Sequence, residues 1–552
     1  MICMNRRLAF LMALILVLMK NSDAMLKVHG GANGAIYIRA DGLIDPQTAP
    51  ISSIDNVTYT FASDINGSIV VQRSNIMIDG NGYALEGPRT GNGFYLYGIS
   101  NVTIRKTAIR GFENGILFYR TSNNTITGNI IEANSRHGIR FDSSLGTTIV
   151  GNVITKNNLK GISFQFASRN TISENNITNN YEGIYFDESH NNTVIGNIIA
   201  TSNQYCILIY LSSGNTITRN TIATSDQYGI HLQKCSGTNI AGNKITSNRY
   251  DGIRLYMSSS NTIIRNNITT NNDNGIDLYN SLENKILEND MTSNDADGIL
   301  LIYSSNNTLG RNKITKNKNN GIGASFSSNN TISGNTLLNN DDGIHFQDSS
   351  NNNIYRNNFV DNTNHWRSYG STNVWDNGVE GNYWSNYTGA DSDHDGTGDS
   401  PQILDANNQD NHPLMGMFHS FNTSSGYYVN IVSNSTIEDF EYLESSNTIK
   451  IYVSNITESQ TFGFCRVCIP KGLISPPYTV IVDEGLTEVL HFNETIYANS
   501  THIWIYFAYE HPDHEVAIIS GYGNYYSLFI TVTLFMIVIL LAVLVYRKKH
   551  TI

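Results

Sequence analysis

The sequence predicts an all-β protein whose main part is a parallel β-helix of 22–23 residues per coil, followed by a small β-sandwich and one transmembrane helix. Two markers with the same period predict the β-helix. The first is a Gly-Ile pair, with Cys once in place of Gly, at Gly115, Gly138, Gly161, Gly183, Cys206, Gly229, Gly252, Gly275, Gly298, Gly321 and Gly343. The second is an Asn in constant phase with it, at Asn129, Asn152, Asn175, Asn197, Asn220, Asn243, Asn266, Asn289, Asn312, Asn335 and Asn357. No repeat contains a stretch of helical periodicity, which argues against leucine-rich, ankyrin and tetratricopeptide repeats.

Each repeat holds three short apolar segments, as at 125–126, 130–131 and 139–141, with Gly, Asn and Ser between them. Segments this short can pair only with the equivalent segments of neighbouring coils, so stacking in register gives parallel sheets along a solenoid. Stacked Asn side chains then hydrogen-bond from coil to coil, and Gly allows a tight corner. We therefore interpret both markers as structural.

The period also sets the domain boundaries. Residues 25–66 are expected to cap the open end of the β-helix, which spans 67–365. Residues 366–418 form a C-terminal cap that contains an Asp-rich loop. Beyond it, residues 419–520 carry alternating strand segments separated by turn residues, a pattern typical of a small β-sandwich.

Both ends of the chain carry membrane signals. Residues 1–24 have two Arg, an apolar run and a small-residue ending, which predicts a signal peptide; an uncleaved N-terminal anchor is the alternative. Residues 527–545 carry no charge and are long enough to cross a bilayer, and the tail 546–552 begins with Arg and Lys. This order predicts a single-pass protein of the cell membrane with an extracellular ectodomain and a cytoplasmic tail. Asn-x-Ser/Thr acceptors for N-glycosylation fit an exported chain, for example at Asn56, Asn101, Asn176, Asn386 and Asn455.

Four carboxylates alternate in the Asp-rich loop. Asp391, Asp393, Asp395 and Asp399 take positions 1, 3, 5 and 9 of an EF-hand-like loop, with Gly396 at position 6. Crowded carboxylates repel each other unless a hard cation lies among them, and oxygen ligands suit Ca²⁺. We expect a structural Ca²⁺ site, although position 12 is Gln and no helices flank the loop. A solvated acidic turn is the alternative.

Net charge and cysteine content limit the possible partners and scaffold types. The chain of 552 residues has 35 Lys and Arg against 47 Asp and Glu, a net charge of −12, which disfavours nucleic acid as a partner. Five Cys in this length exclude a disulfide-dense scaffold. Cys465 and Cys468 lie on a predicted strand and face opposite ways, so a redox or metal pair is not expected.

One strand face per coil mixes aromatic and polar side chains. On each Gly-Ile strand the residues between the inward Ile and its apolar neighbour point outward. Aromatic rings beside hydrogen-bonding groups suit sugar rings, and the expected ligand-binding residues are Arg140, Tyr185, Asp187, Tyr256 and Tyr279. His231, Arg254 and Asp277 occupy three successive coils and are the candidates for acid–base catalysis, if the protein is an enzyme. The alternative is that all of these residues are only the outside of a strand.

The repeat signature Asn-Thr-Ile-x-x-Asn followed by Gly-Ile-x-Leu/Phe resembles the right-handed parallel β-helix repeats of the NosD-like and pectate-lyase-like family over residues 69–415. The ending Gly381-Asn382-Tyr383-Trp384-Ser385, followed by the Asp-rich loop, is more specifically similar to NosD-like proteins. The resemblance implies export, and a C-terminal domain with a membrane anchor occurs in archaeal-type members.

Three functions follow as alternatives. The catalytic motifs of polygalacturonases and alginate epimerases are absent from the sequence, and the coils are regular, so the first interpretation is a surface protein that binds glycans or acts as an adhesin or spacer. The second is a polysaccharide lyase, hydrolase or epimerase. The third, implied by the NosD resemblance, is a copper-handling accessory protein. Only His412, Met415 and Met417 offer a local set of copper ligands, and apolar neighbours favour core packing there, so copper is not the expected cofactor.

Overall fold

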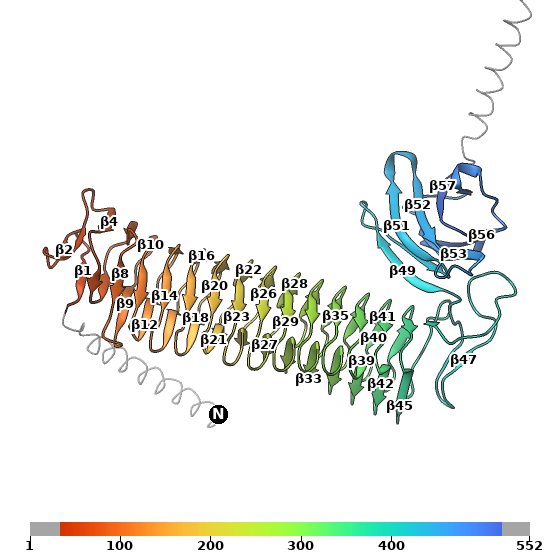
Figure 1. The fold of residues 1–552 in the computed structure, drawn as a ribbon, viewed down its shortest axis with the longest axis horizontal. Helices are drawn as coiled ribbons and strands as arrows, with labels where there is room; N and C mark the ends of the chain where they lie inside the picture. Colours follow the sequence, from red (N-terminus) through yellow and green to blue (C-terminus); the bar gives the residue numbers. More distant parts are fainter. Residues whose placement is uncertain (1–33, 521–552) are drawn as a thin grey trace, which may run out of the picture. The chain divides into compact units, whose positions relative to one another are not determined.

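Short strands dominate the structure because Gly, Asn and Ser return every few residues along the repeats. The computed structural model describes residues 34–520, and it is an all-β parallel solenoid of about 14 turns with small antiparallel sheets (Figure 1). The parallel β-helix and the small antiparallel sheets agree with the predicted all-β class. The chain divides into two compact units. The first comprises the described residues up to 330 with 339–349 and 367–370, and the second comprises 331–338, 350–366 and 371–520.

Three sheets run along the first unit, and each coil contributes one strand to each of them. We call the first the Gly-Ile sheet, because its strands carry the Gly-Ile pair. Its strands pair in the order β2 (Ile44–Asp45), β1 (Ile36–Ile38), β6 (Ile69–Val71), β9 (Asn92–Tyr97), β12 (Asn114–Tyr119), β15 (His137–Asp142), β18 (Lys160–Gln165), β21 (Glu182–Asp187), β24 (Ile207–Tyr210), β27 (Ile230–Gln233), β30 (Ile253–Tyr256), β33 (Ile276–Tyr279), β36 (Ile299–Ile302), β39 (Asn320–Ser325) and β42 (Asp342–Gln347). All of these pairs are parallel except that of β1 with β2.

The other two sheets have shorter strands. The second sheet contains β3 (Ile51–Ser52), β4 (Thr58–Phe61), β7 (Ile76–Asp79), β10 (Val102–Arg105), β13 (Thr125–Thr127), β16 (Thr148–Val150), β19 (Thr171–Ser173), β22 (Thr193–Ile195), β25 (Thr216–Thr218), β28 (Asn239–Ala241), β31 (Thr262–Ile264), β34 (Lys285–Leu287) and β37 (Thr308–Gly310). The third contains β5 (Ile65–Asn66), β8 (Ala84–Glu86), β11 (Ala108–Arg110), β14 (Ile130–Glu132), β17 (Val153–Thr155), β20 (Asn176–Thr178), β23 (Ile198–Ala200), β26 (Thr221–Ala223), β29 (Lys244–Thr246), β32 (Asn267–Thr269), β35 (Asp290–Thr292) and β38 (Lys313–Thr315).

Apolar stacks and Asn ladders hold the coils together. Inward residues such as Ile139, Ile149 and Ile154, one from each sheet, are fully buried. At the turn between the second and third sheets, the Asn220 amide donates to Val194 O, Thr218 O and Asn243 Oδ1 at 2.9–3.0 Å. The same pattern repeats at the phased Asn residues, so each ladder satisfies backbone groups that the tight turn buries.

The second unit begins with short parallel strands. β40 (Thr331–Ser333) pairs with β43 (Asn353–Tyr355), and β41 (Thr336–Leu338) pairs with β44 (Asn358–Val360), which pairs with β46 (Tyr383–Trp384). β45 spans Asn364–Tyr369, and β47 (Gln402–Ile403) pairs with β48 (Gln409–Asp410).

Two antiparallel sheets follow, and they share one hydrophobic core. The first has the order β49 (Met417–Asn422), β50 (Tyr428–Ser433), β53 (Phe462–Pro470), β56 (His502–Glu510) and β55 (His491–Ala498). The second has the order β51 (Thr436–Leu443), β52 (Thr448–Ser454), β57 (His514–Ser520) and β54 (Tyr478–Val482), with 3₁₀ turns at Glu444–Ser446 and Asp483–Gly485. Cys465 and Cys468 are buried on β53 as free thiols.

No helix between residues 34 and 520 is long and apolar enough to cross a bilayer. The predicted signal peptide 1–24, transmembrane segment 527–545 and cytoplasmic tail 546–552 all lie outside the described residues.

Candidate functional site

The three catalytic candidates lie side by side on the Gly-Ile sheet. His231 on β27 is in register with Arg254 on β30, and Arg254 is in register with Asp277 on β33. Their side chains leave the outer face of the sheet, but His231 is only 8% exposed and Asp277 only 4%. Neighbouring side chains therefore cover this part of the sheet, which a bare outward strand face would not predict.

Two tyrosines cover the imidazole of His231. The ring centroids of Tyr205 and Tyr228 lie 5.4 and 5.2 Å from that of His231, and the two tyrosines stack on each other at 5.8 Å. Within residues 34–520 neither imidazole nitrogen has a hydrogen-bond partner. Burial lowers the pKa of His231 to about 4, helped by the Arg254 charge, so the ring is neutral at neutral pH.

Arg254 is the centre of the site. Its Nη1 donates to Tyr228 Oη at 2.8 Å and lies 3.3 Å from Asp277 Oδ2 and 3.7 Å from Asp251 Oδ2. The guanidinium is half-buried, and it bridges two carboxyl groups that come from different coils. The positive charge of Arg254 thus lies between two buried carboxyl groups.

Those acids form what we call the acidic cluster: Asp251, Asp273, Asp277 and Asp297. Burial, together with nearby carboxylates, raises the pKa of Asp277 and of Asp297 to about 6, although Arg254 opposes the rise at Asp277 and the Asn320 hydrogen bonds oppose it at Asp297. Burial also raises the pKa of Asp251 well above its usual range, and that of Asp273 is raised for the same reason. A general acid or base has to exchange protons close to neutral pH, and the pKa values of Asp277 and Asp297 meet this condition.

Asparagine side chains fix two members of the acidic cluster. Asp251 Oδ1 accepts hydrogen bonds from the Asn274 backbone N–H at 3.1 Å and from Asn274 Nδ2 at 2.9 Å. Asp297 Oδ1 accepts the same pair from Asn320, at 3.0 and 2.9 Å. Asp277 Oδ1, in contrast, has no partner within the described chain.

Sequence reasoning did not find Asp251, Asp297 or the covering tyrosines. All of them occupy the position just before the Gly of the Gly-Ile pair, where the strand has not yet begun and alternation does not apply. The signal was nevertheless present, because this position is polar or tyrosine in every coil: Asn92, Asn114, His137, Lys160, Glu182, Tyr205, Tyr228, Asp251, Asn274, Asp297, Asn320 and Asp342.

The predicted ligand-binding residues Arg140, Tyr185 and Asp187 lie on earlier coils. Lys160 Nζ lies 2.9 Å from the centroid of the Tyr185 ring and 3.5 Å from Glu182 Oε2. Burial and the nearby carboxylates raise the pKa of Tyr185 to about 12. Arg140 and Asp187 are half-buried on β15 and β21. This group contains two basic side chains, Arg140 and Lys160, whereas Arg254 is the one basic side chain described beside the acidic cluster.

Aromatic rings continue along the sheet beyond Tyr256 and Tyr279. These two rings stack with centroids 5.4 Å apart, Tyr303 follows edge-on at 6.0 Å, and Phe326 stacks on Tyr303 at 5.1 Å. Tyr303 is 50% and Phe326 46% exposed. We call these four rings the aromatic strip; it runs over four successive coils, and Tyr303 and Phe326 are its exposed members.

Comparisons with known proteins fit this architecture. The sequence profile described as "Right handed beta helix region" matches residues 17–164 and 136–268, and the profile "Periplasmic copper-binding protein (NosD)" matches residues 244–389. The chain belongs to the NosD-like and pectate-lyase-like family of right-handed β-helices. No curated protein sequence matches it.

Solved structures similar to this NosD-like chain are remote. The periplasmic alginate epimerase AlgG covers 62% of this chain and 84% of its own, at 16% identity and a TM-score of 0.35. The A-module of the mannuronan C-5 epimerase AlgE6 from Azotobacter vinelandii covers 56% and 91%, at 14% identity and 0.38. The Dettilon tailspike protein covers 82% and 87%, at 13% identity and 0.33.

The Asp-rich loop follows the NosD match. Ligand atoms of Asp391, Asp393 and Asp395 all lie within 4.8 Å of one another. Asp391 accepts the backbone N–H groups of Asp395 and Gly396, both at 3.0 Å. Asp399, the fourth predicted ligand, instead accepts the N–H of Ser392. Three converging carboxylates supply part of the oxygen donor set that Ca²⁺ takes.

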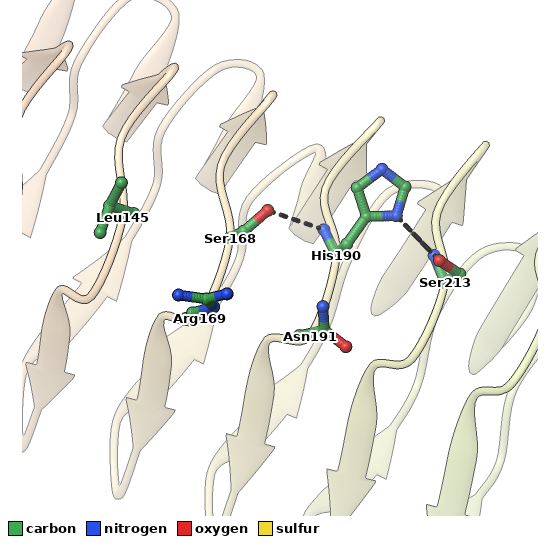
Figure 2. A pocket seen from close by; sticks show the side chains of 6 residues that line it. All are labelled: Leu145, Ser168, Arg169, His190, Asn191 and Ser213. Carbon is green, nitrogen blue, oxygen red and sulfur yellow. Dashed lines mark hydrogen bonds between the residues drawn. The ribbon is translucent and has the colours of Figure 1, made fainter.

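A shallow depression lies along equivalent turns of the first unit (Figure 2). His190 connects its own coil to both neighbouring coils there. Its backbone N–H donates to Ser168 Oγ at 3.4 Å, and its ring Nδ1 accepts the backbone N–H of Ser213 at 3.0 Å. Arg169 is the only side chain in its lining with a permanent charge. The depression is therefore a surface groove between the turns of neighbouring coils. The acidic cluster together with the aromatic strip is the stronger candidate site.

Proposed function

We propose that this protein is an exported surface protein that binds an extended glycan along the Gly-Ile sheet. The observation that carries the proposal is the acidic cluster with Arg254 next to the aromatic strip, on successive coils of one sheet. Ring faces take the apolar faces of sugars, and carboxyl, guanidinium and amide groups take the hydroxyls.

A polymer suits this surface better than a small ligand. Equivalent positions repeat about every 4.8 Å along a β-solenoid, so one repeating ligand can make the same contact on several coils. The Gly-Ile intervals stay at 22 or 23 residues from Gly115 to Gly343, so no long loop closes over the sheet. We infer that the primary role is binding rather than catalysis.

The export and anchoring parts of the proposal rest on sequence. Residues 1–24 would direct secretion, and residues 527–545 would hold the ectodomain at the cell membrane. In the second unit, Asp391, Asp393 and Asp395 would hold Ca²⁺ as a structural ion.

Polysaccharides immobilised in native gels test the binding function. The probes are a neutral mannan, acidic alginate and pectin, and basic chitosan. At least one should retard the parent protein, and the double variant Tyr256→Ala/Tyr279→Ala should be retarded less. Replacing both Tyr97 and Tyr119 by Ala is the matched control, because these rings stack equally, at 5.5 Å, but lie far along the sheet from the acidic cluster. Equal retardation of the parent and the Tyr256/Tyr279 variant by every polysaccharide would refute the proposal.

A second candidate function is acid–base cleavage of the bound glycan. It is favoured by Asp277 and Asp251, which flank one guanidinium nitrogen and whose pKa values are both raised by burial. If this activity exists, Asp277→Asn should abolish the release of reducing or unsaturated ends, while the polysaccharide still retards the variant in the gel. Failure of the parent to alter any of the retarding polysaccharides leaves binding as the function.

A further inference from the structure

A second, polar cavity lies in the second unit and shares no residue with the acidic cluster or the aromatic strip. Its volume is about 540 Å³, within the range of pockets that hold small ligands. Its walls come from three segments: residues 361–366, which include the start of β45, residues 384–386, at the end of β46, and Gln402 on β47. Trp384 and Ser385 belong to the Gly-Asn-Tyr-Trp-Ser ending, which the proposed glycan-binding face does not use.

The back wall of the cavity is rigid. Trp384 is 1% exposed, stacks on Phe359 at 4.3 Å and donates its Nε1–H to Asp410 Oδ2 at 2.9 Å. Trp366 is half-buried and stands edge-on to Trp375, with centroids 6.3 Å apart. One aromatic side chain is thus fixed in the core, and a second reaches the cavity with part of its ring exposed.

Polar groups also line the wall of the cavity. Ser385 Oγ accepts the Asp361 N–H at 3.2 Å, so its own hydroxyl proton is free to point at His365 Nε2, 3.2 Å away. His365 Nδ1 has no partner among residues 34–520. The exposed carboxylate of Asp361 and the exposed amide of Asn386 complete this wall.

We propose that this cavity binds one neutral sugar residue. A half-buried tryptophan beside carboxylate, amide, imidazole and hydroxyl groups offers contacts to both the apolar face and the hydroxyls of a pyranose ring. The lining is too polar for an apolar ligand, and it contains Asp361 but no Lys or Arg, which disfavours an anionic sugar. The proposal does not depend on the proposed glycan-binding site, because it uses no residue of the acidic cluster or the aromatic strip.

The sugar has two possible sources. It can be a free saccharide or the end of a glycan, or it can be a glycan attached to this chain, because Asn386 begins an Asn-Tyr-Thr acceptor sequence at the rim of the cavity. Thr388→Ala separates the two, since it destroys the acceptor but keeps the Asn386 side chain.

The test uses the full chain made in a host without N-glycosylation. Glucose, galactose, mannose, N-acetylglucosamine and glucuronate are titrated at millimolar concentrations and followed by tryptophan fluorescence and saturation-transfer NMR. At least one neutral sugar should bind. Trp366→Ala should weaken it roughly three- to tenfold, which is the contribution of one aromatic stacking partner, and Trp366→Phe should retain most of the affinity.

Two controls separate this cavity from the glycan-binding face and from attached glycan. Tyr256→Ala/Tyr279→Ala should leave sugar binding unchanged. In a glycosylating host, binding that appears only in Thr388→Ala would show that attached glycan occupies the cavity, which also supports a sugar site. The proposal is overturned if no neutral sugar binds either the unglycosylated chain or Thr388→Ala, if glucuronate is preferred, or if Trp366→Ala binds as tightly as the parent.

Discussion

Replacing Asp277 by Asn should stabilise the protein above pH 6 and leave it unchanged near pH 4. The folded pKa of this buried carboxyl is about 6 against an ordinary 3.8, so the folded state holds the proton more tightly than the unfolded state. A carboxyl of this kind destabilises the fold as pH rises through the interval between the two values. Each pKa unit corresponds to about 1.4 kcal/mol, so the full penalty above pH 6 is about 3 kcal/mol.

The assay is urea unfolding of parent and variant at pH 4, 6 and 8. The gain in unfolding free energy should be near zero at pH 4 and approach about 3 kcal/mol at pH 8. Asp142→Asn is the matched control, since this half-buried carboxylate on the same sheet already has a hydroxyl partner in Ser143. A gain at pH 8 no larger than that at pH 4 would refute the account of Asp277. A confirmed gain would mean that a carboxyl is kept at a cost in stability, as at binding or catalytic sites.

Three further perturbations test the rest of the account. Asn220→Ala removes five hydrogen bonds of a ladder and should cost about 3–5 kcal/mol of unfolding free energy, whereas Asn203→Ala at an exposed turn should cost almost nothing; equal effects would contradict the ladder's role. A calcium chelator should lower the melting temperature of the parent but not of Asp393→Ala/Asp395→Ala, and identical melting of the parent with and without chelator would leave only an acidic turn. Truncation before Tyr525 should release the ectodomain into the medium, and its retention in the membrane fraction would point to an uncleaved N-terminal anchor.

Much of the β-helix could be predicted because the fold repeats the same physical requirement in each coil. A tight turn needs a small residue, and its buried backbone needs an amide partner, so Gly-Ile and the phased Asn recur with one period. Two further Asn ladders were not recognised as ladders, although the Asn of one of them opens the repeat signature Asn-Thr-Ile-x-x-Asn. Thr147 and Thr238 interrupt one of them, and Ser202 and Ser225 interrupt the other, so their sequence signal is weaker.

The candidate site could be predicted only in part. Strand alternation placed Arg254, Asp277 and Tyr256 on the outer face, and these residues do lie at the site. Strand alternation could not place Asp251 or Tyr228. Both residues lie in the turn before a strand of the Gly-Ile sheet, and from there their side chains contact Arg254. The burial of His231 also depends on rings from two coils, which no single repeat encodes.

Oxidative footprinting tests glycan binding along the Gly-Ile sheet most directly. Hydroxyl radicals label exposed aromatic rings, and the chain carries internal controls in Tyr427 and Tyr497, each 41% exposed in the second unit. With a retarding polysaccharide bound, labelling of Tyr303 and Phe326 should fall clearly, while labelling of Tyr427 and Tyr497 should stay constant. Unchanged labelling of Tyr303 and Phe326 under saturating polysaccharide would contradict the account.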